Sequence, residues 1–389
     1  MNLKGVTLWC VWLFLLEVSL AGVRKYKFDV EYINGEPYCV KQVVIGINGH
    51  FPGPTITAEE GDTLHIILTN KLSTQGIVLH WHGIRQYGTP WADGTASISQ
   101  CAIAPGQTFH YRFTAERAGA YFYHGHDGFQ KLEGVNGALI VRSREKKEAF
   151  DYDGEFNLLL SDWWQKNTHQ PQSLLMNGRG QYNCSMAANV MNTSLPQCKF
   201  RGNEKCAPQI FYVHPNKTYR LRIASATSST SLNLAIGEDG KHGSTRVNDN
   251  HGLATDTGLL GRLPTRASAD RHRQAQRLTL VGSSGVDSRN GTTRLTTNTG
   301  RTRPTTEMAL ADDQHGSTKW VVVEADGNYV QPFTTDNIHI HSGETYSVLI
   351  TTNQSPNTNY WISVSVTGGE TTPQALAILN YRRKKNPNK

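Results

Sequence analysis

The sequence predicts an all-β fold with two β-sandwich domains. First, short runs between residues 25 and 141 alternate apolar with polar side chains, as half-buried strands do. Second, turn signals such as Phe51-Pro52-Gly53-Pro54 and Ala104-Pro105-Gly106 separate these runs at intervals typical of sandwiches. Third, a further series of strand-like runs begins near Phe156, and 389 residues are long enough for two or three domains.

The first domain is expected to cover residues 22–145. Alternation predicts half-exposed strands over residues 28–32 and 109–113, whereas the apolar runs 43–46 and 64–68 predict buried strands. Two further runs, Ile77-Val78-Leu79 and Ala120-Tyr121-Phe122-Tyr123, are rich in strand formers, and each leads directly into a pair of histidines.

The second domain is expected to cover residues 146–381, with strands over 156–162, 218–223 and, after a break, 319–324. The break, residues 238–318, contains no Phe, Tyr, Trp or Cys. Such a composition buries too little apolar surface to offset the entropy lost on ordering, so we predict a disordered insertion. A regulatory loop and a retained intron or gene-model error are the two interpretations, and the second is favoured.

Two histidine pairs carry the strongest functional signal. His80 and His82, and likewise His124 and His126, lie two positions apart, so on a strand each pair points to one face. Four converging imidazoles suit copper, zinc or iron, whereas a single pair is more often a partly buried structural feature. A third pair, His339 and His341, lies in an alternating polar and apolar stretch, and we interpret it as surface.

The N-terminus has the pattern of a secretory signal, residues 1–21, with Lys4 before an apolar run and small residues near Ala21. This run is too short to span a membrane, and no other stretch approaches the ~20 apolar residues required. The net charge is +7, with a basic tail at 382–389, but basic residues do not cluster with aromatic ones as in nucleic-acid-binding modules. We therefore expect a secreted protein that binds neither membranes nor nucleic acids.

Three runs resemble the first domain of the blue multicopper oxidases. They are His80-Trp81-His82-Gly83, the stretch from Thr89 to Cys101 that includes Trp91-Ala92-Asp93-Gly94, and Tyr123-His124-Gly125-His126. Together with residues 323–333, they are most similar to the plant ascorbate oxidases within that family. The resemblance implies cupredoxin-like Greek-key sandwiches, copper as the cofactor, ascorbate and dioxygen as substrates, and the plant cell wall as the location.

In that family a type 2 and two type 3 coppers form a trinuclear cluster between the first and third domains. The resemblance implies that His80 binds the type 2 copper and that His82, His124 and His126 bind the type 3 pair. It also implies a type 1 copper site, which needs a Cys thiolate, two His and usually a Met. The 389 residues contain no His-Cys-His run and no cysteine after Cys206, so we expect the third domain and its type 1 site to be missing from this chain.

The cysteines fit an oxidising compartment. The resemblance implies the disulfides Cys39–Cys206 and Cys184–Cys198, with Cys101 left unpaired. Candidate glycosylation sequons lie at Asn183, Asn192, Asn216, Asn290 and Asn353.

Two functions compete, and a third is weak. The first is a copper-dependent L-ascorbate:oxygen oxidoreductase that this chain represents incompletely, so that the chain by itself does not turn over. The second is an enzymatically silent, cupredoxin-like cell-wall protein, although silent relatives typically lose the histidine pairs. A zinc hydrolase suggested by His124-Gly125-His126-Asp127 lacks its expected additional histidine. We assign no catalytic acid, base or nucleophile. The unpaired thiol of Cys101 is compatible with a homodimer.

Overall fold

The computed structural model describes residues 21–145, 148–164, 171–181, 207–237, 318–367 and 374–382. Several predictions from the sequence lie outside these residues. They are the signal peptide, the insertion, most of the basic tail, the cysteines at 184, 198 and 206, and the sequons at 183, 192 and 290.

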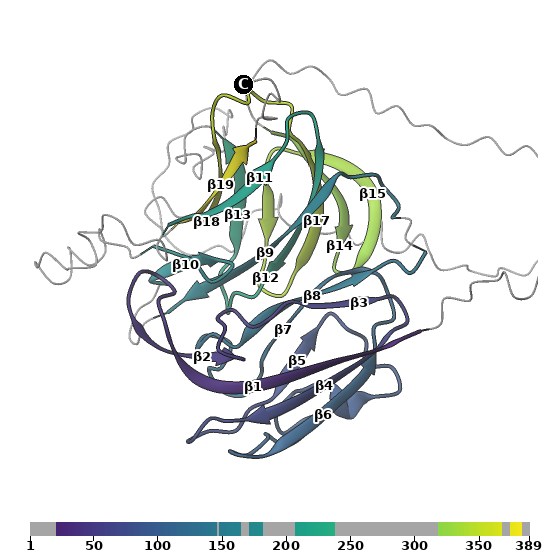
Figure 1. Cartoon of the computed structure of the whole chain (residues 1–389), viewed down its shortest axis with the longest axis vertical. Helices are drawn as coiled ribbons and strands as arrows, with labels where there is room; N and C mark the ends of the chain where they lie inside the picture. Colours follow the sequence, from purple (N-terminus) through teal and green to yellow (C-terminus); the bar gives the residue numbers. More distant parts are fainter. Residues whose placement is uncertain are drawn as a thin grey trace, which may run out of the picture. The chain divides into compact units, whose positions relative to one another are not determined.

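The N-terminal half of the described chain forms a sandwich of two four-stranded sheets (Figure 1). One sheet has the order β2-β1-β4-β6 and the other β3-β8-β7-β5. The strands are β1 (Val23–Gly35), β2 (Gln42–Ile47), β3 (Ile56–Glu59), β4 (Thr63–Asn70), β5 (Leu79–His82), β6 (Thr108–Thr114), β7 (Gly119–Gly125) and β8 (Asn136–Arg142), and a single 3-10 turn, η1, spans Pro90–Ala92.

Apolar side chains from both sheets fill this first sandwich, with Trp81, Phe28 and Tyr123 among the largest that are fully buried. Strand β4 differs from the fully buried strand predicted for residues 64–68. Its side chains alternate, so that Leu64 and Ile66 are buried while His65 lies on the outer face and is partly exposed. A two-layer sandwich leaves the outer face of each sheet open to solvent, which explains the difference.

The C-terminal half forms a second sandwich. Its larger sheet has the order β10-β9-β12-β17-β14-β15, and its smaller sheet has the order β11-β19-β18-β13-β16. The strands are β9 (Gly154–Trp163), β10 (Ser173–Met176), β11 (Gln209–Val213), β12 (Thr218–Ser225), β13 (Leu232–Gly237), β14 (Trp320–Ala325), β15 (Asn328–Thr335), β16 (Ile338–Ile340), β17 (Thr345–Thr351), β18 (Tyr360–Val366) and β19 (Gln374–Tyr381).

A separate apolar core, built around Trp320, Leu221 and Tyr360, lies between these two sheets. The all-β fold with two sandwiches is therefore confirmed. Strand β13 ends at Gly237 in the smaller sheet, and β14 begins at Trp320 in the larger one, so the chain changes sheets across the predicted insertion.

Both sandwiches belong to one compact unit, and a small apolar cluster joins them. Phe122 of β7 is fully buried against Leu159, Ala224 and Ala226 of the second sandwich. No described helix has the length and apolar character needed to cross a membrane. The cluster matters for function because β7 also carries His124, a residue of the candidate site.

Candidate metal centre

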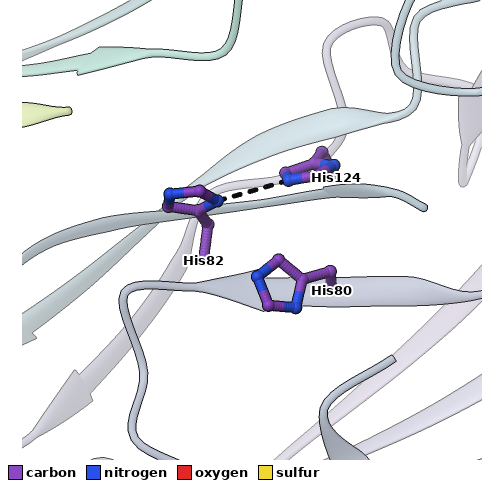
Figure 2. A group of neighbouring side chains, drawn as sticks. All are labelled: His80, His82 and His124. Carbon is purple, nitrogen blue, oxygen red and sulfur yellow. Dashed lines mark hydrogen bonds between the residues drawn. The ribbon is translucent and has the colours of Figure 1, made fainter. Parts of the chain in front are cut away.

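Strands β5 and β7 are antiparallel neighbours, and their register determines the site. His80 lies directly opposite His124, and His82 lies opposite Phe122. Because residues opposite one another in a ladder point to the same face, the first two imidazoles are brought together across the strands. His82 lies two residues after His80 on β5 and therefore points to the same face, beside the other two imidazoles (Figure 2).

Three imidazoles converge. His80, His82 and His124 each offer a ring nitrogen, and these nitrogens all lie within 4.8 Å of one another. His126, the fourth predicted ligand, lies one residue beyond the end of β7 and is exposed. Its ring centroid is nevertheless only 5.4 Å from that of His80, so all four predicted rings are neighbours and three form the tight group.

A backbone carbonyl orients His80. Its Nδ1 lies 2.8 Å from the carbonyl oxygen of Asp93, and because a carbonyl can only accept, Nδ1 carries the proton. The lone pair is therefore on Nε2, which is left for a metal ion. The next residue must be glycine, because Gly94 has φ +79° and an added Cβ would lie 1.7 Å from the carbonyl oxygen of Leu79.

His124 is oriented in the same way. Its Nδ1 donates to the carbonyl of Gly125 at 2.9 Å, which leaves the lone pair on Nε2. This Nε2 lies 3.4 Å from Nδ1 of His82, the contact drawn in Figure 2. Two nitrogens that bind the same metal ion, each at about 2.0 Å from it, lie about 3 Å from one another. The spacing and the nitrogen donors fit a copper ion held between them.

The surroundings keep the imidazoles of His82 and His124 neutral. Burial and the nearby His80 and Lys131 lower the pKa of His82 to about 4. Burial, followed by the charge of Lys131, lowers the pKa of His124 well below its ordinary value. Since only a neutral imidazole offers a lone pair, both side chains are ready to bind a metal at neutral pH.

Sequence reasoning did not assign a role to three of the residues around the histidines. Asp93 belongs to the Trp91-Ala92-Asp93-Gly94 run, but the sequence does not indicate that its carbonyl contacts His80. Phe122 stacks on the ring of His82 with centroids 4.5 Å apart. Lys131 is partly buried, with its Nζ 6.0 Å from the Phe122 ring centroid. The Trp91-Ala92-Asp93-Gly94 run was a usable signal for the first of these, but no sequence signal pointed to the other two.

The third histidine pair lies elsewhere and is exposed, as predicted. His339 belongs to the edge strand β16, where it pairs with Asn233 rather than with a histidine. His341 follows the strand, and its Nδ1 lies 2.7 Å from the hydroxyl of Ser231. Within the described residues, this pair does not join a group of metal-binding side chains.

The remaining predicted positions are partly described. Cys39 forms a disulfide whose partner lies outside the described residues, so the predicted pairing with Cys206 stays a prediction. Cys101 is free and exposed. The sequon residues Asn216 and Asn353 are both exposed, which leaves them accessible to glycosylation.

Two family models match the chain, and both are described as multicopper oxidase. One covers residues 29–146, and the other covers residues 154–239 and 315–384. The chain belongs to the multicopper oxidase family. The second match is interrupted between residues 239 and 315, within the stretch where the sequence predicts an insertion.

Similar curated proteins of this family include plant L-ascorbate oxidases, which confirms the resemblance drawn from the motifs. The chain is 47% identical to the L-ascorbate oxidase of Nicotiana tabacum, over 95% of this chain and 54% of that protein. It is 45% identical to that of Cucumis sativus, over 94% of this chain and 52% of that protein. The chain thus spans about half the length of the curated relatives it matches.

Solved multicopper oxidases share the fold. The laccase from Botrytis aclada superposes with a TM-score of 0.64 at 24% identity, over 95% of this chain and 54% of that one. The multicopper oxidase mgLAC superposes with a TM-score of 0.58 at 16% identity, over 95% of this chain and 89% of that one. At these identities the likeness is one of fold alone.

Proposed function

We propose that the chain supplies one half of the trinuclear copper cluster of an L-ascorbate:oxygen oxidoreductase. The observation that carries this proposal is the group of three imidazoles on β5 and β7, whose ring nitrogens lie within 4.8 Å of one another. The similarity to plant L-ascorbate oxidases supports the choice of ascorbate as the reducing substrate. Dioxygen is then the oxidant, and the predicted signal peptide together with the similarity to these plant enzymes supports secretion to the plant cell wall.

Each histidine has a distinct place in the proposed site. His80 lies at the centre, with its ring centroid 5.4 Å from those of His82, His124 and His126. It would hold the type 2 copper through Nε2, and the other three would bind the type 3 pair. Bound copper would supply the redox chemistry that passes electrons from ascorbate to dioxygen, which yields water after four electrons.

The protein residues prepare the site rather than react. The Asp93 and Gly125 carbonyls hold protons on Nδ1 of His80 and His124, so Nε2 of each faces the site. Burial lowers the pKa of His82 and of His124 and so keeps these two imidazoles neutral, and the stacked Phe122 ring excludes water from one face of His82. This arrangement lowers the reorganisation needed when copper binds.

A full cluster needs more ligands than these. The 389 residues contain no His-Cys-His run, the pattern that carries the type 1 thiolate in the resembling family. The loops after β5 and β7 expose Tyr87, Trp91, Ile98 and Phe129, each at least 59% accessible, which fits a surface that another domain covers.

Copper loading followed by three measurements tests the proposal. A Cys101→Ser chain, in which the exposed thiol cannot bind copper, should take up copper with nitrogen hyperfine coupling in its electron paramagnetic resonance spectrum. It should show no intense blue thiolate absorption, and oxygen uptake with ascorbate should stay at the level of free copper. Absence of nitrogen-coordinated copper, or equal coordination in a His80→Gln/His124→Gln chain, contradicts the proposed site.

A further inference from the structure

The sheet β2-β1-β4-β6 of the first sandwich carries positive charge on its outer face. Strands β1, β4 and β6 lie side by side in that order (Figure 1). Lys25 of β1 pairs with His65 of β4, which in turn pairs with Arg112 of β6. Two residues further along β1, Lys27 begins a second row that ends in His110 on β6. These five side chains are called the basic face below.

The basic face points away from the core. Phe28, Leu64 and Tyr111, one from each of the three strands, are buried between the two sheets of the sandwich. Side chains alternate along a strand, so the neighbours of these residues point outward. The basic face is accordingly exposed, apart from the partly buried ring of His65.

The permanent charges of the basic face are not neutralised within the protein. In the part of the chain that the structure describes, no carboxylate forms an ion pair with its two lysines or its arginine. Asp29 lies two residues after Lys27 on β1, but this carboxylate is already paired with Lys71 at 2.6 Å. An anion from outside the chain can therefore approach the basic face without displacing an internal partner.

The two histidines of the basic face contact each other. Nε2 of His65 lies 3.1 Å from Nδ1 of His110. Burial lowers the pKa of His65, and the positive charges of His110, Lys25 and Arg112 lower it further. A metal cation between the two imidazoles would meet the same repulsion. The surroundings of the pair thus favour an anion, rather than a metal, as the ligand of this surface.

Hydroxyl groups border the basic face on both sides. Along β4, Thr63 precedes it and Thr69 follows it, and these residues pair with Thr114 and Thr108 of β6. Ile67, in the second basic row, is partly buried. A ligand that carries both carboxylates and hydroxyls complements such a surface, whereas binding to a membrane surface requires a large apolar face as well as cations.

We propose that the basic face binds an acidic polysaccharide, a polymer of uronic acids, through the carboxylates of the polymer. Lys25 and Arg112 are two strand spacings apart, about 10 Å, so a chain with many carboxylates contacts several cations at once. The choice of polymer rests on the proposed location in the plant cell wall, whereas the charge of the surface does not. This contact holds the secreted protein in the wall and leaves the metal centre, on β5 and β7 of the other sheet, uncovered.

Binding of a fluorescently labelled oligogalacturonate to the metal-free Cys101→Ser chain, measured by anisotropy at low salt, tests the proposal. Lys25→Gln/Arg112→Gln removes two charges of the basic face. We expect this change to lower the affinity about 10- to 30-fold. Added salt should weaken the binding of the parent chain, because exposed charges are screened.

A second double variant controls for net charge. Lys41→Gln/Arg85→Gln also removes two exposed positive charges, but at positions outside the basic face. We expect it to change the affinity less than about 2-fold. Equal losses in the two double variants would show that only the net charge matters, and they overturn the proposal. Absence of binding to the parent chain overturns it as well.

Two other polymers test the chemistry of the ligand. Fully methyl-esterified oligogalacturonate has the same sugar backbone without the charges and should not bind. Single-stranded DNA should bind more weakly than the uronate oligomer, because the basic face contains no Phe, Tyr or Trp on which bases stack. Equal binding of the methyl ester, or tighter binding of the DNA, overturns the assignment to an acidic polysaccharide.

Carbodiimide coupling locates the contact on the parent chain without a variant. A bound carboxylate that carbodiimide has activated forms an amide bond with the Nζ of an adjacent lysine, and a urea is released. Peptide mapping then identifies the lysine. Coupling at Lys25 and Lys27 supports the proposal, whereas coupling confined to other lysines overturns it, even where a double variant does not fold.

The proposed copper site fails or stands separately. These measurements use the metal-free chain, so a failure to bind the oligomer leaves the proposed metal centre untouched. A chain that binds the oligomer through Lys25 and Arg112 but does not coordinate copper through nitrogen keeps the polysaccharide surface and loses the proposed function.

Discussion

Each sandwich contains a cluster of ionisable side chains, and the two clusters are built differently. In the first, His82 and His124 direct ring nitrogens at one another without an opposite charge between them. In the second, Arg220 and Glu324 are both fully buried and form an ion pair at 2.5 Å. Burial by itself would lower the pKa of Arg220, but the attraction of Glu324 and Glu148 raises it well above its ordinary value.

The presence or absence of an opposite charge within the cluster distinguishes a structural cluster from a candidate ligand site. Charges that pair inside the protein are already satisfied and stabilise a particular packing, although the net gain from such pairs is often small. The imidazoles hold no opposite charge within their own group, and converging nitrogen donors of this kind suit a transition-metal cation. Burial of polar groups alone therefore does not identify a candidate metal site, whereas the convergence of ring nitrogens does.

The largest effect on stability is expected in the ionic cluster. Glu324→Gln removes the charge opposite the buried Arg220 guanidinium, which should cost about 3–5 kcal/mol of unfolding free energy. Urea unfolding monitored by tryptophan fluorescence measures this change, with the surface variant Glu31→Gln as control. A loss below 1 kcal/mol, or a loss equal to that of the control, contradicts a structural role for the pair.

In the histidine cluster, a substitution is expected to change copper affinity rather than the stability of the fold. His80→Gln removes the central imidazole and should lower copper affinity more than about 100-fold, beyond the typical cost of losing a second-shell partner. The unfolding free energy of the metal-free chain should change little, because His80 is partly exposed. Competition with a chromogenic copper chelator gives the affinity. His339→Gln, on β16 in the exposed third pair, should leave copper affinity unchanged, and an equal loss in both variants refutes the assignment.

Asp62 shows that pairing, rather than the choice of sandwich, makes the difference. Burial would raise the pKa of this first-sandwich carboxyl, but hydrogen bonds from Arg24, from the N–H groups of Glu59 and Gly22, and from Arg144 hold it well below its ordinary value. The folded pKa lies below the unfolded value of about 3.9, so the stabilisation is complete above that pH and is lost as pH falls toward the folded pKa.

The expected contribution of Asp62 at neutral pH is about 2–3 kcal/mol. Urea unfolding of the parent chain and of Asp62→Asn, compared at pH values from 7 down to 2, measures it. The difference between the two chains should be constant from pH 7 to 5 and should shrink below pH 4. A difference that grows on acidification contradicts the assignment.

The smallest effect is expected at an exposed ion pair. Lys71 and Asp29 are 2.6 Å apart, nearly as close as Arg220 and Glu324, but their side chains are 49% and 41% exposed. Water and salt screen this attraction, so Lys71→Gln should not move the urea midpoint measurably. A shift comparable to that of Glu324→Gln would show that distance, and not burial, determines the strength of these pairs.

The sequence by itself determined the strands and the ligand candidates. Alternation and turn residues predicted both sandwiches, because the two-residue repeat of a strand is a local property that a short window reveals. The spacing of His80 and His82 predicted a shared face for the same reason. Local pattern did not predict that β4 is only half buried, since this depends on which face meets the other sheet.

Only the tertiary structure decided which histidines meet and how their nitrogens point. His80 and His124 are brought together by the register of β5 and β7, while the equally spaced His339 lies opposite Asn233. The carbonyl of Asp93, thirteen residues from His80, selects the tautomer of that ring, and Gly343, far along the chain, contacts His82. A tautomer depends on hydrogen bonds between segments distant in sequence, and such contacts leave no periodic signal in the chain that forms them.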